Sequence, residues 1–165
     1  MSVHNHRAAI TGTKGERILK EILNSHGLNL LNKKADFKAH GLTREGRKTF
    51  KCPYSESGIF LSDGFIPELN IIVEYKYGEA HGSTEEKIFC DLEKIRDGVY
   101  GTEFPLVYIF KGTVEVSPSE GKRCWAKIVA NKIKKENLPV EVVFADTDNG
   151  LEKWILEKKK ALIDD

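Results

Sequence analysis

The sequence predicts an α/β fold in which a mixed sheet is flanked by helices on both faces. The first observation is an apolar, mostly β-branched run at 69–73, which is typical of a buried strand. Two further apolar runs, at 105–110 and 139–144, have the same character. Stretches with helical spacing of apolar residues lie around these runs, so the predicted order is helix, two or three strands, helix, strand, helix, strand, helix.

The first predicted helix begins at Thr13, because Thr13 and Glu16 have the spacing of a capping box. Residues 1–10 carry no periodic pattern. The apolar stripe of this helix is formed by Ile18, Leu19, Ile22 and Leu23. Gly27 is the expected end of this helix. Residues 28–31 either begin an edge strand or extend the apolar core of the helix.

The segment 32–52 is polar, basic and glycine-bearing, which favours a long loop or ribbon. Residues 33–51 contain seven Lys or Arg residues and two acidic residues, which gives this segment a net charge of +5 in a chain whose net charge is +1. We expect these cations to contact nucleic-acid phosphates, while a solvated surface loop is the alternative. The cations are Lys33, Lys34, Lys38, Arg44, Arg47, Lys48 and Lys51.

Two short apolar runs, at 59–66 and 69–73, are separated by the turn-like segment 67–70. Side chains two apart on a strand share a face, so Glu74 and Lys76 are expected side by side. If the two runs pair antiparallel, Asp63 comes near Glu74. Two carboxylates and an ammonium at the edge of an apolar sheet are costly unless they are paired or hold a metal.

Beyond the hairpin, residues 83–86 form a second capping-box pattern that opens a helix. In this helix Lys87 and Asp91 have the spacing of a surface ion pair. A further helix is predicted over 118–136, and a last one over 151–163. The basic face of the 118–136 helix is a second candidate for phosphate contact, and solvation explains it equally well. That face includes Lys122 and Arg123.

Length and composition predict a single domain over 1–165, with 40% hydrophobic and 31% charged residues. No apolar run approaches the roughly 20 residues of a membrane span, and the N-terminus lacks the apolar core of a signal peptide. The three cysteines are far apart, which favours free thiols in a reducing compartment and a cytoplasmic protein.

Five Asp/Glu-x-Lys triplets occur, and only the one at Glu74 follows a strand-forming run with an Asp in a preceding run. This arrangement resembles the PD-(D/E)xK nuclease superfamily, in which Ser62 and Asp63 match the PD pair and Glu74 and Lys76 match (D/E)xK. The proline of the family's motif is absent here. The resemblance covers about half of the chain and implies a restriction-endonuclease-like αβββαβ core.

The resemblance implies Mg²⁺, with Mn²⁺ as a substitute, bound by Asp63, Glu74 and the backbone carbonyl of Tyr75. Carboxylates are the hard oxygen donors that Mg²⁺ prefers. Lys76 would orient the attacking water, favour hydroxide and stabilise charge on the phosphate. Glu16 would be a further catalytic residue and metal ligand on the first helix. Glu85 or Lys87 on the helix after the hairpin would touch metal-bound water or a phosphate.

By this resemblance, the expected function is a DNA endonuclease that leaves 5′-phosphate and 3′-hydroxyl ends, most simply a restriction-type enzyme or its catalytic subunit. The expected partners are double-stranded DNA and either a second copy of the chain, as a homodimer, or a recognition subunit. The basic segment 32–57 would be an insertion on the DNA side. A Holliday junction resolvase is the nearest alternative enzyme, and a non-catalytic nucleic-acid-binding module is the alternative from another class.

Overall fold

The protein is described by a computed structural model, which places the backbone of residues 3–79 and 83–164 and the side chains of 13–79 and 87–164. The helices are α1 (Val3–Ser25), α2 (Lys34–Ala39), α3 (Ser83–Arg96), α4 (Trp125–Lys135) and α5 (Gly150–Asp164). The strands are β1 (Thr49–Lys51), β2 (Ile59–Leu61), β3 (Gly64–Ile66), β4 (Ile71–Gly78), β5 (Leu106–Gly112) and β6 (Val140–Phe144).

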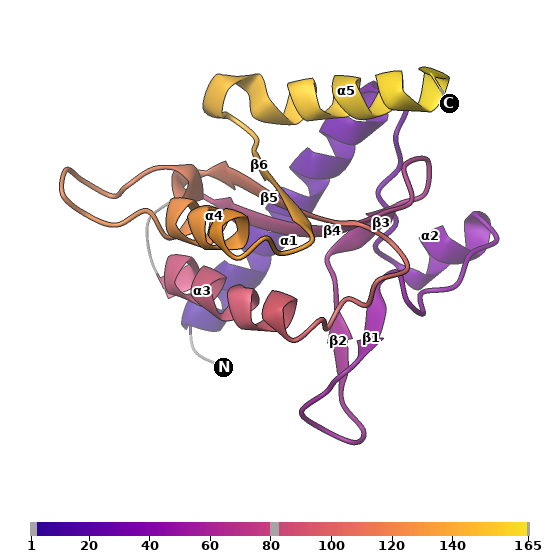
Figure 1. Ribbon diagram of the computed structural model, residues 1–165, viewed down its shortest axis with the longest axis horizontal. Coiled ribbons are helices and arrows are strands. Elements are labelled where there is room, and N and C mark those ends of the chain that lie inside the picture. The colour runs from indigo at the N-terminus through magenta and orange to yellow at the C-terminus, as the bar shows by residue number, and fades with distance from the viewer. Residues whose placement is uncertain (1–2, 80–82, 165) are drawn as a thin grey trace.

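A mixed four-stranded sheet has the strand order β3-β4-β5-β6. Strand β3 pairs antiparallel with β4, and Gly64 lies opposite Val73. Strands β5 and β6 continue the sheet in parallel, with Tyr108 of β5 beside Glu74. Strands β1 and β2 form a separate antiparallel ribbon that projects from the body of the molecule (Figure 1). The predicted mixed sheet with flanking helices is confirmed.

Helices cover both faces of the sheet (Figure 1). Helices α1 and α5 pack on the face that carries Val73 and Tyr75, while α3 and α4 pack on the face that carries Ile72. Because side chains alternate along a strand, Glu74 and Lys76 point to the same face as Ile72. The two charged residues therefore lie under α3.

Strands β2 and β3 are one stretch of chain with a break at Ser62 and Asp63. The β1–β2 pairing ends there, and the pairing with β4 begins directly afterwards. The ammonium of Lys48 donates to the carbonyl oxygens of Ser62 and Asp63, with 3.1 Å to the Asp63 oxygen. Buried carbonyls need such partners when a ladder is interrupted. The break thus fixes Asp63 at the junction of the two sheets.

Helix α1 begins at Val3, so the predicted start at Thr13 is wrong, and Glu16 lies within the helix. A capping box begins a helix only if the preceding chain is not helical, and the alanines at 8 and 9 favour a helix that already includes that chain. Helix α4 begins at Trp125, so a helix over 118–124 is also wrong. Gly121 has φ +76°, which interrupts any helix before that point and leaves Lys122 and Arg123 in a loop.

The segment 32–52 contains both a short helix and a strand. The ribbon is confirmed at β1, whereas α2 was not anticipated. One carboxylate oxygen of Asp36 accepts the backbone N–H groups of Asn32 and Lys33 at 3.2 and 3.0 Å, and Phe37 is buried. This capping and one apolar anchor account for a six-residue helix within a basic stretch.

Glu115 is a buried carboxylate that joins the ends of β5 and β6. It accepts the backbone N–H groups of Gly112, Asp146 and Thr147, each at 3.1 Å. We expect Glu115→Gln to lower the free energy of unfolding by roughly 2–3 kcal/mol, because the amide turns one acceptor into a donor against these N–H groups. Urea denaturation measures this, with the exposed Glu120→Gln as control. Equal stabilities of the two variants would contradict the role of Glu115.

Candidate active site

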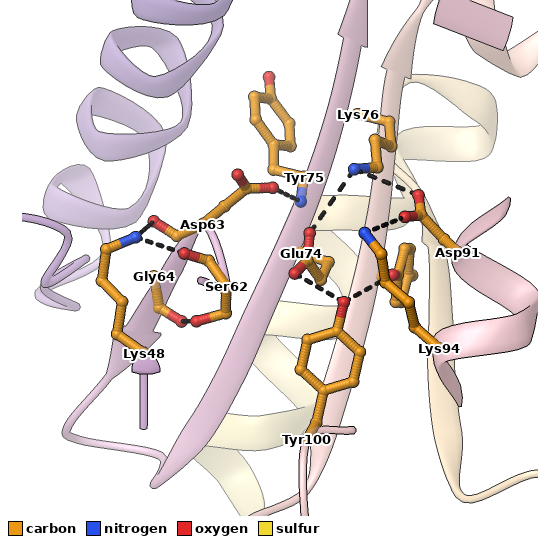
Figure 2. Close-up of polar contacts among 11 residues, drawn as sticks. Lys48, Ser62, Asp63, Gly64, Glu74, Tyr75, Lys76, Asp91, Lys94 and Tyr100 are labelled. Carbon is orange, nitrogen blue, oxygen red and sulfur yellow. Dashed lines mark hydrogen bonds and ion pairs between the residues drawn. The ribbon is translucent and has the colours of Figure 1, made fainter. Parts of the chain in front are cut away.

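Asp63 turns its carboxylate toward β4 (Figure 2). Its backbone N–H donates to the carbonyl of Val73 at 3.1 Å, and its Oδ2 accepts the backbone N–H of Tyr75 at 2.6 Å. A Cβ atom at Gly64 would lie 2.6 Å from Cδ1 of the buried Leu30, so any larger residue directly after Asp63 would force Leu30 to move. The hydrogen bonds to Val73 and Tyr75 of β4 together hold the Asp63 carboxylate in place.

Glu74 is almost fully buried, with 4% of its surface exposed. Its Oε1 accepts the hydroxyl of Tyr100 at 2.9 Å, and the hydroxyls of Tyr100 and Tyr108 lie 3.2 Å apart. Tyr108 is the neighbour of Glu74 across the β4–β5 pair, and Tyr100 follows α3. Tyr100 thus donates a hydrogen bond to the buried Glu74 carboxylate, and Tyr108 bonds to Tyr100 behind it.

The pKa of Glu74 is raised to about 8, first by burial and then by the negative charge of Asp63. A hydrogen bond between the two side chains, with Glu74 protonated, raises this pKa further. The positive charge of Lys76 opposes the shift. Burial and the neighbouring Asp63 carboxylate thus favour the protonated form of Glu74.

Lys76 lies between two carboxylates (Figure 2). Its Nζ is 3.6 Å from Oε2 of Glu74 and 3.2 Å from Oδ2 of Asp91 on α3. Burial alone would lower the pKa of Lys76, but the charges of Glu74, Asp91 and Asp63 outweigh burial and raise the pKa above its usual range. Lys76 therefore carries a fixed positive charge beside Glu74.

Lys48 departs from the expectation of a surface phosphate contact. Only 9% of it is exposed, and its ammonium is bonded to the carbonyls at the β2–β3 break. Burial lowers the pKa of Lys48, and the charge of Asp63 offsets part of this effect. The sequence placed Lys48 among surface cations because its burial depends on a chain break that composition does not reveal.

Of the other proposed catalytic residues, Glu16 and Lys87 have described side chains, and neither forms a hydrogen bond or ion pair with Asp63, Glu74 or Lys76. Glu16 is half-buried and accepts a hydrogen bond from Nδ2 of Asn32 at 3.0 Å, and among the placed side chains none of its hydrogen bonds reaches Asp63 or Glu74. Lys87 is exposed on α3 and, within that same set, has no contact with Asp63 or Glu74. The side chain of Glu85 lies outside the described residues.

The remaining proposed DNA contacts are divided between exposed and half-buried cations. Arg47 is half-buried and its guanidinium lies 5.5 and 4.8 Å from the ring centroids of Phe65 and Phe104. Arg44 is also half-buried. The cations that remain exposed and available for phosphate contact are Lys33, Lys34, Lys38, Lys51, Lys122 and Arg123.

The site fits a cation that keeps most of its water ligands. Among the residues whose side chains are placed, no three or more His, Cys, Asp or Glu side chains gather closely enough to hold a metal. Asp63 and Glu74 supply two carboxylates, and Mg²⁺ is commonly held by one or two carboxylates with waters. The N–H and C=O of a strand residue point the same way, so the Tyr75 carbonyl faces the edge where Asp63 lies.

Two residues near this group were not singled out as site residues. The sequence suggested only a surface pair of Asp91 with Lys87, but Asp91 is 3% exposed and pairs with Lys76 and Lys94. A signal was present, because Asp91 falls within the apolar stripe of α3 formed by Ile88, Leu92 and Ile95. The contact of Tyr100 with Glu74 had no such local signal.

Comparison with protein families, curated proteins and solved structures found no match for this chain. Within the described ranges 3–79 and 83–164, no helix has both the length and the apolar character that crossing a membrane requires. Asp63, Glu74 and Lys76 are therefore the residues from which a function can be inferred.

Proposed function

We propose that the protein is a Mg²⁺-dependent DNA endonuclease of the restriction-endonuclease-like class. The observation that carries the proposal is the convergence of the Asp63 and Glu74 carboxylates beside the charged Lys76, at the junction of β3 and β4. The element order adds support. With the short helix α2 left aside and β2 and β3 counted as one bent strand, α1, β1, β2–β3, β4, α3 and β5 follow the αβββαβ order that the resemblance to PD-(D/E)xK nucleases implies.

Hydrolysis of a phosphodiester requires an activated water and neutralisation of the phosphate charge. Asp63, Glu74 and the Tyr75 carbonyl would hold Mg²⁺, which when bound supplies a more acidic water and attracts a phosphate oxygen. Because its pKa is raised, Lys76 keeps its proton and acts as a fixed cation that stabilises charge on the phosphate. The Tyr100 hydroxyl, itself bonded to the Tyr108 hydroxyl, orients Glu74 from the buried side.

Exposed cations are available to hold the DNA backbone. Lys33 directly precedes α2, Lys34 and Lys38 lie on α2, and Lys51 lies on the ribbon. Such contacts position a duplex without reading its sequence. Cutting both strands with one site per chain calls for a homodimer or a separate recognition subunit, which makes a restriction-type enzyme the first choice. A Holliday junction resolvase remains the nearest alternative enzyme.

Digestion of supercoiled plasmid tests this proposal. We expect nicked and linear products with Mg²⁺ or Mn²⁺ and none with EDTA, and products whose 5′ ends accept label from a kinase only after phosphatase treatment. The exposed Glu152→Gln is the matched control and should cut like the unaltered protein. Cleavage that persists in EDTA would contradict the proposed metal dependence. Discrete bands would indicate a sequence-specific enzyme, and cleavage confined to four-way junctions a resolvase.

A nucleic-acid-binding module without catalysis is favoured by a different observation. Lys76 is bracketed by Glu74 and Asp91, and a buried ion cluster of this kind is also found as a purely structural feature. The two functions differ in one measurement. A module retards DNA in a gel at low salt but leaves supercoiled plasmid intact with every divalent cation tested.

A further inference from the structure

Asp91 is a buried carboxylate that holds two lysines. Its Oδ2 lies 3.2 Å from Nζ of Lys76, and its Oδ1 lies 3.1 Å from Nζ of Lys94 (Figure 2). The Asp91 side chain is 5% exposed, compared with 22% for Lys76 and 32% for Lys94. The carboxylate thus lies deeper than either ammonium that it binds.

A carboxylate at this point of α3 is expensive unless it has a function or full pairing. The stripe of α3 that packs on the sheet is otherwise apolar, and an aliphatic residue would fill the same position. Asp91 is also the nearer of the two carboxylates to Lys76, since Glu74 is 3.6 Å away. Asp91 of α3 therefore holds the Lys76 ammonium at least as closely as Glu74 of its own strand does.

A lysine side chain has four rotatable bonds and a compact charge that one ion pair constrains poorly. When Glu74 binds a cation, its carboxylate is shared and its hold on Lys76 weakens. The second contact from α3 would remain. The facing charged groups are then Asp91 and Lys94 on α3, Glu74 on β4 and Asp63 before β3.

We propose that Asp91 is a positioning residue, which holds the Lys76 ammonium beside the Asp63–Glu74 pair while those carboxylates bind the cation. This inference rests on the proposed nuclease function and adds to it a residue that the (D/E)xK pattern does not include. Asp91 touches neither the cation nor the phosphate. It affects the reaction only through the position in which it holds the Lys76 ammonium.

The kinetic test is a double-mutant cycle. We expect Asp91→Asn to reduce the kcat of plasmid cleavage roughly 10- to 100-fold with little change in KM, because a small displacement of a catalytic group has effects of this size. In a Lys76→Met background the same Asp91→Asn change should have no further effect. Lys94→Met removes the other partner of Asp91 and should change cleavage less than about threefold, the size of one exposed ion pair.

A loss in Asp91→Asn that is equally large in the Lys76→Met background would overturn the proposal. So would a loss in Lys94→Met that equals the loss in Asp91→Asn, because the network would then matter as a whole rather than through Lys76.

A second measurement does not depend on cleavage. A restrained, solvent-protected lysine ammonium gives an observable ¹H–¹⁵N signal in NMR, whereas a freely rotating one exchanges too fast. We expect a Lys76 signal, assigned by its loss in Lys76→Met, that disappears in Asp91→Asn and persists in Lys94→Met. Persistence of the signal in Asp91→Asn overturns the positioning role. A chain that never cleaves DNA but loses the signal in Asp91→Asn would contradict the proposed nuclease while leaving the Asp91–Lys76 contact supported.

Discussion

Replacing Glu74 with glutamine is expected to abolish DNA cleavage and, without divalent cations, to stabilise the protein at alkaline pH. Glutamine keeps the shape of Glu74 and can still bond to Tyr100, but it removes the charge that a divalent cation requires. A loss of several kcal/mol of transition-state stabilisation corresponds to roughly a thousandfold slower cleavage. Activity and stability should therefore change in opposite directions.

The sign of the stability effect follows from the raised pKa of Glu74. Its value is about 8 in the folded protein, compared with 4.5 for an unperturbed glutamate. Below about pH 4.5 both the folded and the unfolded chain carry the proton, so the group adds no difference. As the pH rises to about 8, the unfolded chain loses its proton first, and the free energy of unfolding falls. At roughly 1.4 kcal/mol per pKa unit, the full effect is about 5 kcal/mol.

Urea denaturation in EDTA at pH 5 and at pH 8.5 measures this difference. Glu74→Gln should be more stable than the unaltered protein by about 2–4 kcal/mol at pH 8.5, and by much less at pH 5. The matched control is Glu152→Gln, an exposed substitution on α5 that should change neither value. Cleavage that survives in Glu74→Gln, or a stability gain that does not depend on pH, would rule out Glu74 as the buried ligand.

The approach of Asp63 to Glu74 could be predicted because it depends on local rules. The 67–70 turn, the apolar runs around it and the alternation of side chains along a strand are all written in neighbouring residues. The structure confirms the antiparallel pairing and its register at Gly64 and Val73. The same rules place Lys76 on the same face of the sheet as Glu74, and Nζ of Lys76 lies 3.6 Å from Oε2 of Glu74.

The surroundings of the pair could not be predicted in the same way. Tyr100 reaches Glu74 from a position 26 residues further along the chain, which depends on how the segment after α3 folds back over the sheet. Lys48 is buried because the strand breaks at Ser62, whereas charge counting groups it with exposed neighbours. Asp91 could be predicted in part, because its place in an apolar stripe indicates burial but does not identify Lys76 as its partner.

The affinity for divalent cations is expected to rise about tenfold per pH unit between roughly pH 6 and pH 8, and to level off above that range. The cation and the proton compete for Glu74, whose pKa is raised to about 8 by burial and by the charge of Asp63. Binding at pH 6.5 must therefore release close to one proton, and binding at pH 9 close to none. The affinity change arises from the apo protein, because it is the unbound state that holds the proton.

Calorimetric titration with Mn²⁺ or Mg²⁺ measures this release when each pH is studied in two buffers of different ionisation enthalpy. Released protons make the apparent binding enthalpy depend on the buffer at pH 6.5 but not at pH 9. The exposed Glu152→Gln on α5 serves as the control, because it keeps both proposed ligands and their charged neighbours and should retain the proton release. An affinity that is the same at pH 6 and pH 8 would mean that the cation does not displace the proton of Glu74. The two carboxylates would then form a structural pair rather than a metal site, since a cation that binds there cannot leave the proton in place.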